Sequence, residues 1–348
     1  MARALFLIDT PNQVFNIIEA IREYQLSDYD LMINDCNRVD TYAQLKARIA
    51  VLTPTHLIEV PRMTGDISGR IEVYARHLVF LQSRQYSHVF FSAIRQQWQR
   101  DIVCSVDAQK HILLDDGNAT VIFYDCLFHQ QKFFDFPEDP DSERSQRAAA
   151  IRAQWHIKTS GLSTLELFTI FDLSPMPWLT VRRNLLTKMY KNHQHLDADL
   201  VCLLGVGAVT VNYITEQGYL DLLAQTKDLF PEKRLCYIPH RIESDALLTA
   251  IAKLGFSVQR LDMPVENWLY QSKVAPYAVL SYHSTALFTC AAMFPAIRVI
   301  SIQPPIEVWR DAASSHIWNF TACNNQEGLA TVYKYLKKDK NVECIALN

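Results

Sequence analysis

Short apolar runs that stop at polar residues alternate with helix-like segments twice along this 348-residue chain. The first set opens with "ALFLID" at residues 4–9, and "VFNIIEAIREY" follows it with apolar residues at helical spacing. The second set opens with "ADLVCLLG" and ends with the helix-like "EGLATVYKYLKK". Strands that alternate with helices predict mostly parallel sheets with helices on both faces. We therefore predict an α/β chain built from two similar halves.

The stretch between the two sets differs in composition, being first acidic and then rich in proline and basic residues. We place an N-terminal domain at 1–175, a linker at 176–198 and a C-terminal domain at 199–348. Within the first domain, "GRIEVYARHLVFLQSR" at 69–84 predicts one long helix.

The composition excludes several classes of protein. The net charge of −3 argues against a nucleic-acid binder, which usually has a basic balance. The eight cysteines include no CxxC pair and have mostly apolar neighbours, which predicts reduced, buried thiols and no zinc or other metal site. We see neither a signal peptide nor a run of about 18 apolar residues, and so we expect a cytoplasmic protein.

Two apolar runs in the second half end in clusters of polar residues. "LCYIP" ends at His240 and Arg241, and "AVLSYH" ends at Ser284 and Thr285. Ligands of open α/β sheets bind beyond the carboxyl ends of the strands, so these residues are candidates for one site. Hydroxyls and the N–H groups of a first helical turn suit a phosphate; the alternative is plain N-capping by Ser284 or Thr285, and the two roles are compatible.

His240 has the chemistry of a proton donor to a leaving phosphate oxygen, because the pKa of an imidazole lies near neutral pH. Arg241 offers a charge-assisted partner for phosphate or carboxylate. The alternatives are a structural histidine and an ordinary surface ion pair.

The first half offers two candidate segments. In "LLDDGNAT", Asp115 or Asp116 at a strand end could take a proton from an attacking hydroxyl, hold a divalent metal, or simply form a turn. In "DTPNQ", polar side chains follow the first strand, where Thr10 or Asn12 could instead cap a helix. A basic run at 182–191 suits an anionic membrane surface or a solvated face.

Four patches in this order resemble glycosyltransferase family 52, the bacterial lipooligosaccharide sialyltransferases. They are "IDTPNQVFNIIEAI", "ILLDDGNAT", "CYIPHR" and "PVENWL" with the later "YAVLSYHSTALFTCAAMF". The resemblance implies a GT-B architecture, with two Rossmann-like domains facing across a cleft and the donor bound mainly by the second. It also implies CMP-sialic acid as donor, no required metal or other cofactor, and inversion at the anomeric carbon.

Carried over by position, the resemblance has His240 act on the departing CMP phosphate and Ser284 and Thr285 hold that phosphate. It has Glu266 meet the cytidine or its ribose. His283 belongs to the same donor-binding set, and the segment after the first strand adds Thr10, Asn12 and Gln13.

The resemblance leaves the catalytic base open between two places. Asp115 or Asp116 fits the acid-acid-Gly type of related bacterial sialyltransferases. The other place reads "YITEQGYL", where Gln217 cannot take a proton and Glu216 would have to serve. His-Arg in place of the common His-Pro is a second departure, and both put the exact donor in doubt.

The expected function is transfer of sialic acid to a hydroxyl of a galactose-type acceptor on lipooligosaccharide or capsular polysaccharide. Peripheral contact with the inner face of a bacterial inner membrane is expected through the basic residues Arg182, Arg183, Lys188 and Lys191, and a homodimer is expected by family analogy. The alternatives are a transferase of the same fold that uses a UDP-hexose or another CMP-nonulosonate, and a non-catalytic saccharide-binding subunit.

Overall fold

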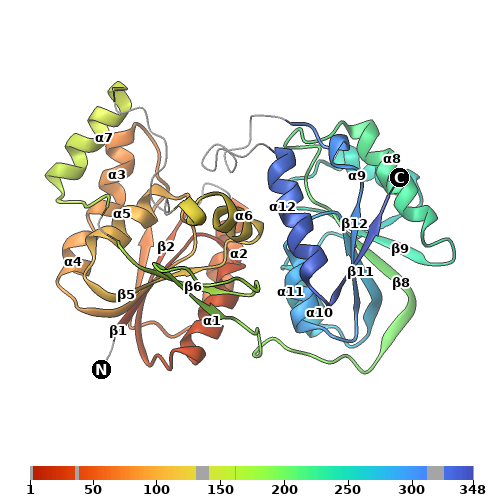
Figure 1. Ribbon diagram of the computed structural model, residues 1–348, viewed down its shortest axis with the longest axis horizontal. Coiled ribbons are helices and arrows are strands. Elements are labelled where there is room, and N and C mark those ends of the chain that lie inside the picture. The colour runs from red at the N-terminus through yellow and green to blue at the C-terminus, as the bar shows by residue number, and fades with distance from the viewer. Residues whose placement is uncertain (1–2, 36–38, 131–140, 161, 312–324, 348) are drawn as a thin grey trace. The chain divides into compact units, whose positions relative to one another are not determined.

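The computed structural model describes residues 3–35, 39–130, 141–160, 162–311 and 325–347. The chain divides into two compact units, each a sheet with helices packed on it (Figure 1). Unit 1 comprises Met1–Asp116 and Leu127–Asn184, and unit 2 comprises Gly117–Cys126 and Leu185–Asn348.

The sheet of unit 1 has seven parallel strands in the order β3-β2-β1-β4-β5-β6-β7. They are β1 (Arg3–Ile8), β2 (Asp28–Asn34), β3 (His56–Val60), β4 (Tyr86–Phe91), β5 (Ala108–Leu114), β6 (Leu165–Thr169) and β7 (Leu179–Arg183). The helices are α1 (Gln13–Glu23), α2 (Val39–Ile49), α3 (Ile67–Ala75), α4 (Leu78–Gln82), α5 (Gln97–Ser105) and α7 (Glu143–Gln154), with a 3₁₀ turn η1 (Phe128–Gln130).

The expectation of one helix over 69–84 is wrong, because α3 and α4 are separate. The N–H of His77 donates to the carbonyl of Tyr74 (3.1 Å) across three residues, so the helical ladder tightens there before it restarts. The apolar spacing continues through the break, and for that reason periodicity alone does not reveal it.

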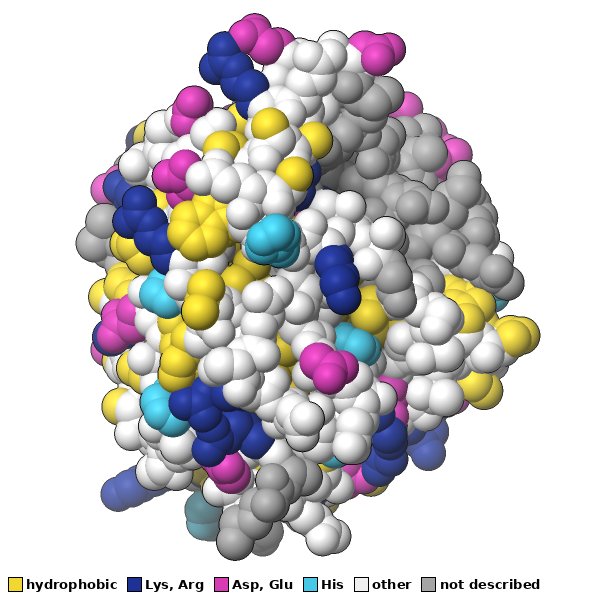
Figure 2. Space-filling view, turned by 90° about the vertical axis from the view of Figure 1, so that its left-hand side faces the viewer, with side chains coloured by type: hydrophobic (Ala, Val, Ile, Leu, Met, Phe, Trp, Pro, Cys, Tyr) yellow, Lys and Arg dark blue, Asp and Glu magenta, His cyan; other side chains and the backbone are white. Residues whose placement is uncertain are grey.

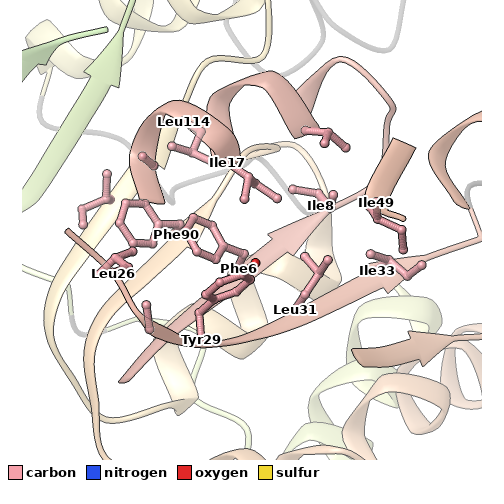
Figure 3. Packing of buried hydrophobic residues seen from close by; sticks show 14 of the residues in the cluster. Phe6, Ile8, Ile17, Leu26, Tyr29, Leu31, Ile33, Ile49, Phe90 and Leu114 are labelled. Atoms are coloured by element: carbon pink, nitrogen blue, oxygen red, sulfur yellow. The ribbon is translucent and has the colours of Figure 1, made fainter. Parts of the chain in front are cut away.

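The core beneath α1 and α2 is built on alternate residues of the strands, whose side chains share one face of the sheet. Phe6 is fully buried there, stacks on Phe90 with ring centroids 4.4 Å apart and meets Tyr29 edge-on at 5.6 Å (Figure 3). Ile17 of α1 and Ile49 of α2 close over the same layer.

The sheet of unit 2 has six parallel strands in the order β10-β9-β8-β11-β12-β13. They are β8 (Leu196–Leu204), β9 (Arg234–Ile238), β10 (Ser257–Val258), β11 (Ala275–Ser281), β12 (Arg298–Gln303) and β13 (Val342–Ala346). The helices are α6 (Asn118–Cys126), α8 (Glu216–Asp228), α9 (Asp245–Lys253), α10 (Val265–Gln271), α11 (Ala286–Met293) and α12 (Asn325–Lys338), with a 3₁₀ turn η2 (Ile306–Val308).

Helix α6 belongs to unit 2, although strands of unit 1 precede and follow it in the chain. The Asp125 carboxylate accepts hydrogen bonds from Lys334 Nζ (2.7 Å) and from the Tyr335 hydroxyl (2.9 Å) of α12. These bonds help to hold α6 against α12 and bring the segment after Asp116 to the second sheet.

Two further expectations can be compared with the structure, together with the charge on its surface. None of the helices in the described ranges combines the length and hydropathy that crossing a bilayer requires. Lys and Arg side chains are interspersed with Asp and Glu on the face that Figure 2 presents. The expectation of reduced thiols is wrong for Cys126, which is disulfide-bonded, whereas Cys104, Cys202, Cys236 and Cys290 are free and buried.

Truncating the central ring tests this core. Phe6→Ala should lower the free energy of unfolding by about 3–5 kcal/mol, because it removes a fully buried ring and leaves a cavity between Phe90 and Tyr29. Urea denaturation followed by circular dichroism measures the change. Leu57→Ala, at a β3 position that is 42% exposed, is the matched control and should cost less than about 1 kcal/mol. Equal losses in the two variants would contradict this packing.

Candidate functional site

The strand order locates a crevice in each unit. In both sheets the first strand lies between the second and the fourth, so the connections leave in opposite directions from the neighbouring pairs β1/β4 and β8/β11. Such a switch point opens a crevice at the carboxyl ends of the strands, where doubly wound proteins bind their ligands. In unit 2 the residues that follow β8, β9 and β11 therefore lie at one edge.

The loop after β8 carries Gly205 and Gly207 and contacts the turn after β9. The N–H of Gly207 donates to Glu243 Oε1 (3.0 Å), and the N–H of His240 donates to Glu243 Oε2 (3.0 Å). The Tyr237 hydroxyl also donates to this carboxylate. Burial raises the pKa of Glu243, and the three donors oppose that rise by stabilising the charged form.

His240 follows β9 and His283 follows β11, and β8 lies between these two strands in the sheet. Burial, with a smaller contribution from the nearby charge of His240, lowers the pKa of His283 to about 4. His283 is therefore neutral at pH 7, and its ring lies edge-on against Trp309 at 5.2 Å. The turns after β9 and β11 leave the carboxyl ends of the two strands that flank β8, so they lie on the same edge of the sheet.

Ser284 and Thr285 immediately precede α11, and their hydroxyl oxygens accept hydrogen bonds from different parts of the chain. Ser284 Oγ accepts a hydrogen bond from the N–H of Ala286 (3.2 Å), which is a local capping bond. Thr285 Oγ1 instead accepts from the N–H of Asn118 (3.0 Å), and Asn118 Nδ2 donates to the carbonyl of His283 (2.6 Å). The hydroxyl hydrogen of Thr285 remains a donor for a ligand.

Gly117 permits this approach of Asn118 to the 283–285 turn within unit 2. Its φ is +64°, and a Cβ there would lie 2.6 Å from Thr285 Oγ1. The glycine of the Asp-Asp-Gly motif thus lies against Thr285, a candidate phosphate-binding residue. A simple turn would not require this contact.

The remaining candidate residues of unit 2 differ in their exposure to solvent. Glu266 is buried in α10 and accepts a hydrogen bond from Thr289 of α11 (2.6 Å). Arg241 is exposed beside His240. Glu216 is exposed in the first turn of α8, a position that favours an acid through the helix dipole, and Thr215 caps that helix.

At the switch point of unit 1, side chains bridge the loops after β1 and β4. Asp9 accepts hydrogen bonds from Trp98 Nε1 (3.0 Å) and Gln99 Nε2 (2.7 Å). Gln13 Oε1 accepts from the N–H groups of Asp9 (2.7 Å) and Thr10 (3.0 Å), so Gln13 shapes the loop. Asn12 is exposed at the start of α1 and makes no side-chain capping bond.

The two acids after β5 differ in what they contact. Asp115 is buried, and its Oδ2 accepts from the N–H of Ile170 (2.7 Å). Asp116 forms an ion pair with Arg95 (2.8 Å), and its side chain is 17% exposed. Of the two carboxylates, that of Asp116 is the better placed to meet a substrate. Within the described ranges, no group of three or more His, Cys, Asp or Glu side chains is arranged to hold a metal ion.

Sequence reasoning missed three residues that organise these sites. Glu243 is a lone acid in a helix-entry segment, Asn118 follows a glycine in an apparent turn, and Asp9 ends a strand. Each acts through partners far along the chain, and no local pattern reveals such pairings. The one available signal for Glu243 was its place three residues after His240 at a strand end.

Comparison with solved structures supports the fold. The Staphylococcus aureus MnaA–UDP co-structure is similar over 98% of this chain and 89% of its own, with a TM-score of 0.51 and 9% identity. The Methanocaldococcus jannaschii UDP-GlcNAc 2-epimerase in complex with UDP-GlcNAc and UDP is similar over 99% of this chain and 89% of its own, with a TM-score of 0.52 and 9% identity.

No protein-family model and no curated protein matches the chain. Membership of glycosyltransferase family 52 therefore stays a prediction. The fold class predicted from the sequence is confirmed: the chain has the GT-B type of fold, with two Rossmann-like α/β units.

The buried Asp9 carboxyl makes stability depend on pH. Burial raises its pKa to about 7, and the charge of Asp116 acts in the same direction. The folded chain then holds a proton that the unfolded chain releases above about pH 4, so this contribution to stability falls as pH rises towards 7.

Asp9→Asn removes this titration. The variant's free energy of unfolding, relative to that of the wild type, should rise between pH 4 and pH 7 and level off above it, as urea denaturation at each pH would measure. A difference that stays constant over this range would contradict the raised pKa.

Proposed function

We propose that this chain is an inverting glycosyltransferase that takes a sugar from a nucleotide donor, with CMP-sialic acid as the donor. One observation carries the proposal. The turns after β8, β9 and β11 present a glycine loop, a histidine and a hydroxyl-bearing helix start at one edge of the sheet of unit 2. The tips of β9 and β11 are separated by two strand spacings, about 10 Å, which is room for a phosphate and part of a sugar.

The start of α11 is the proposed phosphate site. N–H groups at a helix start attract anions, and the Thr285 hydroxyl can add a donor bond to a phosphate oxygen. Glu266 is buried in α10, the helix before α11 in the chain, and accepts a hydrogen bond from Thr289 of α11; it would meet the ribose or cytidine. Arg241 would supply positive charge at the rim.

The reaction can be written with these residues. The bond between the anomeric carbon and the phosphate oxygen breaks, and a bond forms from that carbon to the acceptor oxygen. His240 gives a proton to the departing phosphate, and CMP leaves. The acceptor hydroxyl loses its proton to a carboxylate, for which Asp116 is the better exposed candidate. His283 is unsuited to donate a proton because it is neutral at pH 7.

The second candidate function is a transferase of the same fold that uses a UDP-sugar. Both of the similar solved structures hold UDP according to their descriptions. A galactose-ending saccharide at a bacterial inner membrane is the acceptor that accompanies the first proposal, and a homodimer is proposed with it.

Nucleotide binding separates these proposals. Titration calorimetry with CMP, UDP, GDP and ADP should show the tightest binding for CMP, and a preference for UDP would favour the second candidate. Thr285→Val keeps the shape of the side chain and should weaken CMP binding by about 10–100-fold, the effect of losing a hydrogen bond to a charged group. Thr249→Val, an exposed helix position, is the matched control and should bind CMP as the wild type does. Failure of all four nucleotides to bind would refute a nucleotide-sugar enzyme.

Removing the proposed acid tests catalysis. His240→Ala should lower turnover of CMP-sialic acid by about 10²–10⁴-fold, the usual contribution of proton transfer, while circular dichroism and melting temperature stay near the wild-type values. Undiminished turnover in the variant would remove His240 from the mechanism. Binding of CMP without transfer or donor hydrolysis by the wild type would instead favour a non-catalytic saccharide-binding subunit.

A further inference from the structure

We propose that Glu243 is the positioning residue of the donor site, because its buried carboxylate fixes both the Gly205–Gly207 loop and the backbone that carries His240. The inference rests on the proposed function and deepens it. In this proposal Glu243 does not contact the substrate; it acts by holding the loop after β8 and the turn after β9 in place.

The hydrogen bonds define the role. Glu243 is only 4% exposed, and its two carboxylate oxygens accept hydrogen bonds from different backbone N–H groups. Oε1 accepts from the N–H of Gly207 (3.0 Å), Oε2 accepts from the N–H of His240 (3.0 Å), and the Tyr237 hydroxyl lies 2.9 and 3.0 Å from the two. A single side chain thereby links the turns after β8 and β9.

The glycines show how closely the loop fits over this carboxylate. A Cβ on Gly205 would lie 2.5 Å from the Tyr237 hydroxyl oxygen and 2.6 Å from Glu243 Oε2. Gly207 has a φ of +66°, and a Cβ there would lie 2.9 Å from Ile242 and 3.0 Å from His240 Nδ1. The two glycines of "LLGVG" are therefore explained by the space that the carboxylate, Tyr237, Ile242 and the His240 ring occupy.

A carboxylate suits this position better than an amide does. Two backbone N–H groups approach different oxygens, and an ionised carboxylate accepts at both. A glutamine would direct its NH₂ group at one of the two N–H donors, so one link would be lost. The Tyr219 hydroxyl pairs with that of Tyr237 (2.9 Å), which extends the arrangement to α8 and holds Tyr237 in place.

Glu243→Gln is the direct test, with CMP, UDP and CMP-sialic acid as the probes. We expect affinity for the preferred nucleotide to fall by at least 10-fold and turnover of CMP-sialic acid to fall further. We also expect faster amide hydrogen exchange in peptides that cover 205–211 and 239–243. Because Glu243 acts through His240, the loss of turnover in Glu243→Gln/His240→Ala should be smaller than the product of the single losses.

Asp30→Asn is the matched control. Asp30 is a fully buried carboxylate of unit 1 that accepts from the Tyr86 hydroxyl (2.9 Å) and contacts His56 Nδ1 (2.8 Å). Its loss should lower the melting temperature but leave nucleotide affinity and hydrogen exchange at 205–211 unchanged. This variant separates a positioning effect from general destabilisation.

Gly207→Ala is the second variant, in case Glu243→Gln does not fold. It keeps the carboxylate but pushes the loop away from Ile242 and His240, and it should reproduce the loss of nucleotide affinity. Wild-type affinity and turnover in a folded Glu243→Gln, or wild-type affinity in Gly207→Ala, would overturn the positioning role and leave the proposed function standing. A wild-type protein that binds no nucleotide would overturn both.

Discussion

Parallel strand order is the constraint on which the site in each unit depends. With β8 between β9 and β11, every loop that leaves a carboxyl end in the middle of the sheet emerges at the same edge. His240 and the 283–285 turn come from positions more than forty residues apart, and only this order brings them together. The apolar strands beneath supply no chemistry, but their packing fixes the edge from which the polar turns project.

The two switch points are used differently. In unit 1, Asp9 bonds to Trp98 and Gln99, so the loops after β1 and β4 are tied by buried side chains. In unit 2, the corresponding loop after β8 contains Gly205 and Gly207, and the N–H of Gly207 donates to the Glu243 carboxylate. A bound nucleotide needs close approach of backbone to phosphate, so this contrast supports the proposal that the donor binds to unit 2.

The sequence allowed the fold class and most strands to be predicted, because buried parallel strands are continuous apolar runs with polar ends. Segments 4–8 and 275–281 are examples. Local pattern could not show the break between α3 and α4, where only a hydrogen bond across three residues changes. Nor could it show Glu243 or Asn118, since Gly207 lies 36 positions from the first and Thr285 lies 167 from the second. The polar ends of the strands could be identified from the sequence as a candidate site, whereas the residues that hold those ends in place could not.

His240 and His283 have different roles in the proposed site. Burial keeps His283 neutral, so its ring can shape the turn beside Trp309 without adding a second positive charge near His240. In the proposed reaction the two residues would therefore have separate roles: His240 gives the proton to the departing phosphate, and His283 shapes the turn that precedes the phosphate site at the start of α11.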